Sequence, residues 1–196
     1  EGLPLTARLR LDANAGWDRS TAQAWMHLLR DDPRLAWLEQ PLAVEDQAGL
    51  EQVAALGPVA LDESLDQHPE LRRSWRGWQV RRPALEGDPR LLLRELQAGL
   101  PQRMLSTAFE TGIGRRWLEH LAGLQAQGPT PAAPGLAPGW TPAGPMLSNE
   151  PEQVWAAAAG ASASGWSRGW QRGIGLPCRP KRKRHPSISC RRDRGW

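Results

Sequence analysis

Three acidic residues follow three successive apolar runs, and together they could bind a metal ion. Asp12 follows RLRL, Glu39 follows LAWL and Asp62 follows VAL. The gaps of 27 and 23 residues are close to one strand-plus-helix unit each. If the runs are neighbouring parallel strands, the carboxylates project from one sheet edge, whereas a single one would be an ordinary solvated loop charge. Three oxygen ligands with no Cys or His beside them suit a hard cation, so the spacing predicts Mg²⁺ or Mn²⁺.

Two later positions could add to this chemistry. Arg82 and Pro83 follow the next apolar run, and a turn rich in hydroxyl groups and glycine, Ser106–Gly114, follows the fifth. In a barrel of parallel strands the chemistry gathers at the carboxyl ends of the strands. A metal beside a cationic group could hold an enolate formed by removing a proton next to a carboxylate.

The elements that must position these residues alternate between strand-like and helix-like patterns. We expect strands at 6–11, 35–38, 59–61, 78–80 and 104–106. We expect helices at 20–29 with Ser20 as N-cap, 45–56, 69–76, after Asp88, and 116–126, with a further one at 148–159. Five βα units without a hairpin signal predict an α/β fold, either a barrel or a doubly wound sheet. The 196 residues fall short of the about 250 of a complete eight-unit barrel.

The net charge of +4 averages two unlike segments. Residues 160–196 contain ten Lys and Arg and one acidic residue, which gives +9 and leaves −5 for residues 1–159. Both cysteines and both lysines of the chain lie in this basic segment. We therefore expect a folded domain at 1–159, interrupted by a Pro-, Gly- and Ala-rich stretch at 128–145, and a basic tail at 160–196 that is unstructured.

The tail has two interpretations. Its high content of Trp, Arg, Gly, Ser, Pro and Cys favours a non-native extension, such as the product of a GC-rich gene read out of frame. The alternative is an arm that binds nucleic acid, because positive charge with interspersed Trp suits such a partner. We favour the first and do not expect nucleic acid as a partner. No apolar run reaches the about 20 residues of a membrane span and no signal peptide is evident, so we expect a cytoplasmic protein without a membrane partner.

The sequence motifs around the three carboxylates resemble those of a known family. LRLDANAGW, LEQP, LDES, VRRPALEGDP and LSTAFETGIG follow one another in the order of the barrel domain of the enolase superfamily. Within it they are most similar to the o-succinylbenzoate synthase family of menaquinone and phylloquinone biosynthesis. The resemblance covers about residues 5–126, and it implies an incomplete (β/α) TIM-type barrel whose capping domain and first strands are missing.

The resemblance implies a dehydratase, a carbon–oxygen lyase whose substrate is a small carboxylate. In that family a lysine removes the proton alpha to the carboxylate of 2-succinyl-6-hydroxy-2,4-cyclohexadiene-1-carboxylate, Mg²⁺ stabilises the enediolate, and loss of water gives 2-succinylbenzoate. The metal ligands of the family fall on Asp12, Glu39 and Asp62. Residues that orient the ligands fall on Asn14 and Glu63. The family's turn that holds the carboxylate side of the substrate matches Ser106, Thr107, Gly112 and Gly114 of this sequence.

Two departures from the family concern the base. A lysine pair precedes the Asp-Ala-Asn strand in the family, and this sequence contains no lysine before Lys181. A second family lysine falls on Arg82, which is always protonated and therefore cannot easily act as a base, although it could pair with the enediolate. We expect this chain by itself to be inactive. The alternatives are N-acylamino acid racemase or dipeptide epimerase activity, which needs a base on both faces of the substrate, and a non-catalytic protein with a nucleic-acid-binding tail.

Overall fold

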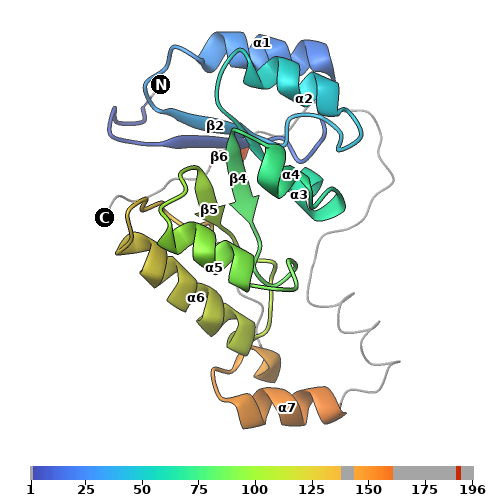
Figure 1. Cartoon of the computed structure of the whole chain (residues 1–196), viewed down its shortest axis with the longest axis vertical. Coiled ribbons are helices and arrows are strands. Elements are labelled where there is room, and N and C mark those ends of the chain that lie inside the picture. Colours follow the sequence, from blue (N-terminus) through green and yellow to red (C-terminus); the bar gives the residue numbers. More distant parts are fainter. Residues whose placement is uncertain (1, 138–143, 161–188, 191–196) are drawn as a thin grey trace. The chain divides into compact units, whose positions relative to one another are not determined.

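The computed structural model describes residues 2–137, 144–160 and 189–190 (Figure 1). Its strands are β1 (Leu9–Asp12), β2 (Leu35–Glu39), β3 (Val59–Leu61), β4 (Trp78–Arg81), β5 (Arg103–Leu105) and β6 (Ser189–Cys190). Its helices are α1 (Arg19–Leu29), α2 (Gln47–Ala54), α3 (Glu63–Gln67), α4 (Leu71–Ser74), α5 (Arg90–Gln97), α6 (Gly112–Ala126), the 3₁₀ turn η2 (Pro145–Leu147) and α7 (Pro151–Gly160). The chain forms two compact units, and the first comprises the described residues up to Arg81 with Leu100–Met104 and β6.

The sheet confirms the predicted α/β fold. Its strand order is β5-β4-β3-β2-β1-β6, and the pairs β1–β2, β2–β3 and β3–β4 are all parallel. Five consecutive strands therefore lie in sequential order, as in the wall of a (β/α) barrel. A doubly wound sheet would reverse its strand order part of the way across, so the barrel alternative is the correct one.

The two faces of the sheet in the first unit have different coverings. On one face, leucines and valines of β1–β3 pack against apolar side chains of α1 and α2, which lie side by side in Figure 1. The other face carries the buried cluster Trp37, Ala60, Val80 and Met104. Arg10 lies over the Trp37 ring at 4.4 Å from its centroid, and Trp37 contacts Trp78 at 4.5 Å between ring centroids.

Alternation along the strands places the carboxylates on this second face. Successive side chains of a strand point to opposite sides, so residues two apart share a face. Glu39 is two residues beyond Trp37, and Asp62 is two beyond Ala60, both members of the buried cluster. Asp12 is likewise two beyond Arg10. A register shift between Leu9 and Arg10 keeps Leu35 and Leu38 together on the helix-covered face.

Three helix starts in the first unit differ from the prediction, and the simplest difference is α2, which begins at Gln47 and not at 45. Asp18, and not Ser20, is the N-cap of α1, since its carboxylate accepts the Thr21 N–H at 2.7 Å. The predicted helix at 69–76 is present but shorter, as α4, and α3 before it was not predicted. His68 between them has non-helical backbone (φ −125°, ψ 74°), because the following Pro69 disfavours helical backbone at the residue before it.

The second unit comprises Arg82–Gly99 and the described residues from Leu105 onward. Its core joins one face of α5 to one face of α6. The buried members of this core are Leu92, Leu96, Leu105, Leu118, Leu121 and Ala122. Gly99 follows α5 with φ +69°, a left-handed conformation that glycine adopts without strain, so the predicted end of this helix is confirmed.

Helix α6 begins four residues before its predicted start. Thr111 is its N-cap, with its hydroxyl accepting the Gly114 N–H at 3.5 Å, so Gly112 and Gly114 belong to the first helical turn. The prediction of a turn extending to Gly114 is therefore wrong beyond Thr111. Glycine has a low helix propensity, so two glycines in the first turn suggested a loop. The N-cap at Thr111 was therefore not predicted.

Beyond Gly160, the last residue of α7, the basic tail is described only at β6, which pairs antiparallel with Leu11 and Asp12. This pairing is an exception to the unstructured tail that we predicted, while residues 161–188 and 191–196 lie outside the described residues. Among the helices of the described part of the chain, none is long and apolar enough to span a membrane.

Candidate metal centre

The backbone brings the three predicted ligands to neighbouring strand ends. Asp12 and Glu39 are direct partners in the parallel register of β1 and β2. Glu39 in turn is the partner of Ala60 in β3, and Asp62 follows β3 as the N-cap residue of α3. All three belong to the first unit, so its own fold places them at one edge of the sheet.

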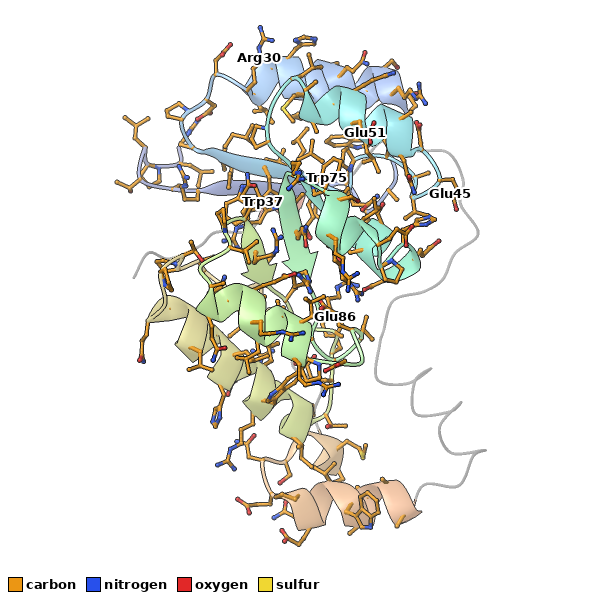
Figure 2. The ribbon with its side chains drawn as sticks, in the orientation of Figure 1. Arg30, Trp37, Glu45, Glu51, Trp75 and Glu86 are labelled. Atoms are coloured by element: carbon orange, nitrogen blue, oxygen red, sulfur yellow. The ribbon has the colours of Figure 1, made fainter. Side chains whose placement is uncertain are left out.

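Glu39 and Asp62 are nearly inaccessible to solvent, with 6% and 3% of their surface exposed, whereas Asp12 is half-buried. Glu39 Oε2 accepts a hydrogen bond from the indole Nε1 of Trp37 at 3.0 Å. Asp12 Oδ1 accepts one from the backbone N–H of Asn14 at 2.9 Å. Trp37, labelled in Figure 2, therefore orients one carboxylate, and the loop after β1 orients another.

The loops beyond β1 and β2 continue the ladder of the two strands. Ala13 N–H donates to the Glu39 carbonyl at 3.1 Å, and Ala15 N–H donates to the Gln40 carbonyl at 2.8 Å. Asn14, Ala15 and Gln40 have positive φ angles of 47°, 55° and 34°. Left-handed backbone at non-glycine residues is costly and clusters at functional sites, which fits a centre at this edge.

The side chains themselves are not yet arranged as a metal cage. Among the described residues, no three His, Cys, Asp or Glu side chains gather closely enough to hold a metal ion. The donor set and the register fit a hard cation, but the carboxylates would have to turn toward a common point. Asp12, Glu39 and Asp62 thus remain predicted ligands on a backbone that suits them.

The two predicted orienting residues lie beside the ligands. Asn14 acts on Asp12 through its backbone N–H, while its own side chain belongs to an exposed residue. Glu63 is the first residue of α3 and is half-buried. Their roles toward a metal remain predictions.

The predicted cationic group is Arg82, which directly follows β4 and is half-buried. It belongs to the second unit, so its approach to the carboxylates remains a prediction. The preceding Arg81 is fully buried and donates to Gln79 Oε1 at 3.3 Å.

The predicted substrate turn has a strong internal network. Ser106 Oγ donates to the Gly135 carbonyl at 3.2 Å, and Thr107 Oγ1 contacts the Glu110 carboxylate at 3.0 and 3.1 Å. The Glu110 carboxylate also accepts the Ala108 N–H at 2.7 Å. Both hydroxyl residues are 7% exposed. These contacts fix the shape of the loop, and substrate binding by Ser106 and Thr107 remains a prediction.

The two glycines predicted to bind substrate, Gly112 and Gly114, lie in tightly packed positions. A Cβ on Gly112 would lie 2.1 Å from the Ser148 carbonyl oxygen and 2.5 Å from that of Leu147. A Cβ on Gly114 would lie 2.8 Å from the side chain of Glu110. Close packing therefore accounts for both glycines without a ligand, and their predicted contact with substrate also stays untested.

The sequence predicted no functional role for Gln40, and for Trp37 only a packing role, although both lie close to Glu39 on the chain. Gln40 is fully buried and bonded to the segment after β3. The available signal was its place in LEQP, where a polar amide stands between a carboxylate and a proline in an otherwise apolar stretch.

The family comparisons agree with this architecture. Residues 3–77 match the enolase C-terminal domain-like family. The chain is 40% identical to o-succinylbenzoate synthase from Thermosynechococcus vestitus over 129 residues, which is 61% of this chain and 40% of that protein. It is 42% identical to a hydrophobic dipeptide epimerase from a Flavobacteria bacterium over 59 residues, which is 29% of this chain and 17% of the epimerase.

Comparison with solved structures points the same way. The crystal structure of o-succinylbenzoate synthase from Thermosynechococcus elongatus, complexed with Mg in the active site, matches with a TM-score of 0.61 and 30% identity. The match covers 87% of this chain and 52% of that one. This chain thus spans about half the length of that structure, and less of the curated relatives.

Proposed function

We propose that this chain carries the metal-binding part of an o-succinylbenzoate synthase-like dehydratase, because residues 3–77 match the enolase C-terminal domain-like family. The observation that carries the proposal is the register of Asp12 with Glu39, with Asp62 at the end of the next strand. The identity to o-succinylbenzoate synthases in sequence and in structure supports the same assignment.

Asp12, Glu39 and Asp62 would hold Mg²⁺, or Mn²⁺ in its place. When bound, the cation supplies positive charge next to the substrate carboxylate, which makes the neighbouring C–H easier to deprotonate. It would also offset the repulsion between nearly buried carboxylates on neighbouring strands. Trp37 and the Asn14 backbone would hold two of the ligands in place through their hydrogen bonds.

The substrate in this proposal is 2-succinyl-6-hydroxy-2,4-cyclohexadiene-1-carboxylate, a menaquinone and phylloquinone precursor, and the product is 2-succinylbenzoate. Arg82 would face the substrate as a fixed positive charge that pairs with a carboxylate. A guanidinium does not accept a proton at neutral pH, so Arg82 orients the substrate and does not deprotonate it. Since the only lysines are Lys181 and Lys183, outside the described residues, we expect binding without turnover.

The test is binding of 2-succinylbenzoate to the full chain, measured by calorimetry with and without Mg²⁺. We expect affinity only in the presence of Mg²⁺, and a loss of about tenfold in Arg82→Ala, as expected for a charge-assisted hydrogen bond. Arg94→Ala is the control, because it also removes one arginine from the second unit. Metal-independent binding, or rapid dehydration by this chain alone, would contradict the proposal.

Dipeptide epimerisation is the second candidate, since a hydrophobic dipeptide epimerase matches 59 residues of this chain. That chemistry needs a proton acceptor on each face of the substrate, and a permanently charged Arg82 does not provide one. In the same calorimetric experiment a hydrophobic dipeptide should bind more weakly than 2-succinylbenzoate. The reverse order would favour the epimerase assignment.

A further inference from the structure

Gln40 occupies a costly position directly after Glu39. It has no exposed surface, and its φ of 34° lies in the left-handed region that a side chain disfavours. Burying a primary amide is unfavourable unless all its hydrogen-bonding groups are satisfied. A buried polar side chain on strained backbone therefore calls for a specific role.

Both ends of the Gln40 amide have two partners. Its Oε1 accepts the backbone N–H groups of Asp62 at 3.1 Å and Ser64 at 3.2 Å. Its Nε2 donates to the Leu42 carbonyl at 2.9 Å and to Ser64 Oγ at 2.7 Å. The opposite amide orientation would set NH₂ against two N–H donors, so the partners fix the orientation of the side chain.

The backbone of Gln40 forms two further hydrogen bonds to neighbouring segments. Its N–H donates to the Ala60 carbonyl at 2.9 Å, and its carbonyl accepts the Ala15 N–H at 2.8 Å. One residue therefore links the segments that follow β1, β2 and β3. Asp12 and Glu39 are the last residues of β1 and β2, and Asp62 directly follows β3.

We propose that Gln40 is a positioning residue of the metal centre, which holds the backbone of Asp62 at a fixed place relative to Glu39. This inference rests on the proposed function, because it assigns a role toward the metal of that site. The Asp62 backbone has φ −125° and ψ −85°, outside the helical and extended regions, and its N–H donates a hydrogen bond to Gln40 Oε1. Partners that orient ligands in this way commonly change metal affinity by about 10- to 100-fold when they are lost.

The test compares Gln40→Leu with Gln79→Leu in the full chain. Gln79 is an equally buried glutamine, and its side-chain hydrogen bonds join Arg72, Trp75 and Arg81, none of which is one of the three carboxylates or its neighbour in sequence. Both variants lose buried hydrogen bonds and stability. At a temperature where both remain folded, only Gln40→Leu should weaken Mn²⁺ binding, by about tenfold or more.

Amide hydrogen exchange provides a readout that does not depend on metal. Without Mn²⁺, exchange at Asp62 and Ser64 should become about tenfold faster in Gln40→Leu and stay unchanged in Gln79→Leu. If Gln40→Leu does not fold, Gln40→Asn removes the same contacts by shortening the side chain and retains its polarity.

The outcomes separate the two proposals. Unchanged exchange at both amides, or equal loss of Mn²⁺ affinity in Gln40→Leu and Gln79→Leu, would overturn the role of Gln40. A native chain that does not bind Mn²⁺ would instead overturn the proposed metal centre. In that case faster exchange in Gln40→Leu would still show that Gln40 holds the Asp62 backbone.

Discussion

Glu39 and Trp37 lie two residues apart on β2, and the indole Nε1 of Trp37 donates to Glu39 Oε2 at 3.0 Å. Trp37 is 1% exposed and Glu39 6%, so this hydrogen bond to a carboxylate is shielded from water. Hydrogen bonds to charged groups are stronger than neutral ones, and leaving a buried acceptor without its donor is costly. The pair therefore connects the buried cluster around Trp37 to the candidate metal centre.

Replacing Trp37 with Phe should lower the free energy of unfolding by about 2–4 kcal/mol, since it removes the N–H donor and leaves a cavity. Urea denaturation measures this change. Trp155→Phe is the matched control, because Trp155 is 79% exposed, and it should change stability by less than about 0.5 kcal/mol. Equal effects of the two substitutions would contradict the structural role of the Trp37–Glu39 bond.

Gly112→Ala should destabilise the second unit, because the added Cβ would lie 2.1 Å from the Ser148 carbonyl oxygen. We expect a loss of about 1–3 kcal/mol from overpacking, measured by thermal unfolding. Gly123→Ala is the control within the same helix, since a Cβ added there would meet nothing within 4 Å. That substitution should instead stabilise by about 0.5–1 kcal/mol through its gain in helix propensity. A neutral Gly112→Ala would show that α6 does not require this close approach.

The fold should lose stability as the pH falls from about 4 to about 2. Hydrogen bonds from Arg34 and Arg90 lower the pKa of Asp32 and of Asp88, each to about 2. A carboxylate whose folded pKa lies below its unfolded value of about 3.9 stabilises the fold above that value, and the contribution disappears as pH falls through the folded pKa.

The double variant Asp32→Asn/Asp88→Asn should therefore lose less stability than the native chain between pH 4 and 2. Thermal midpoints at several pH values measure the difference, and added salt should reduce it because both pairs are near solvent. Asp31→Asn, at a side chain that is 90% exposed, is the control. Parallel pH profiles for the double variant and the native chain would contradict the assignment of these ion pairs.

Much of the fold follows from patterns within single segments. β3 begins and ends where its apolar run predicts, and β2 extends only one residue further, to Glu39. Short apolar runs between helix signals are sufficient for this, because these two strands are largely buried on both faces. The consecutive strand order also follows from the short βα connections.

The candidate site was predictable in position but not in detail. The strand ends identify Asp12, Glu39 and Asp62, since carboxyl ends of parallel strands share an edge. Gln40 was not predictable, because its role depends on Asp62 and Ser64, more than 20 residues away in sequence. The close packing of Gly112 was likewise not predictable, since it depends on Ser148, more than 30 residues away in sequence.

Titration of the full chain with Mn²⁺, followed by the paramagnetic resonance signal of the free ion, tests the metal centre most directly. We expect one site in the native chain and a loss of affinity of about tenfold or more in each of Asp12→Asn, Glu39→Gln and Asp62→Asn. Asp88→Asn, which removes a carboxylate of the second unit, should leave the affinity unchanged. No binding by the native chain, or equal binding by all four variants, would show that Asp12, Glu39 and Asp62 do not form a metal site.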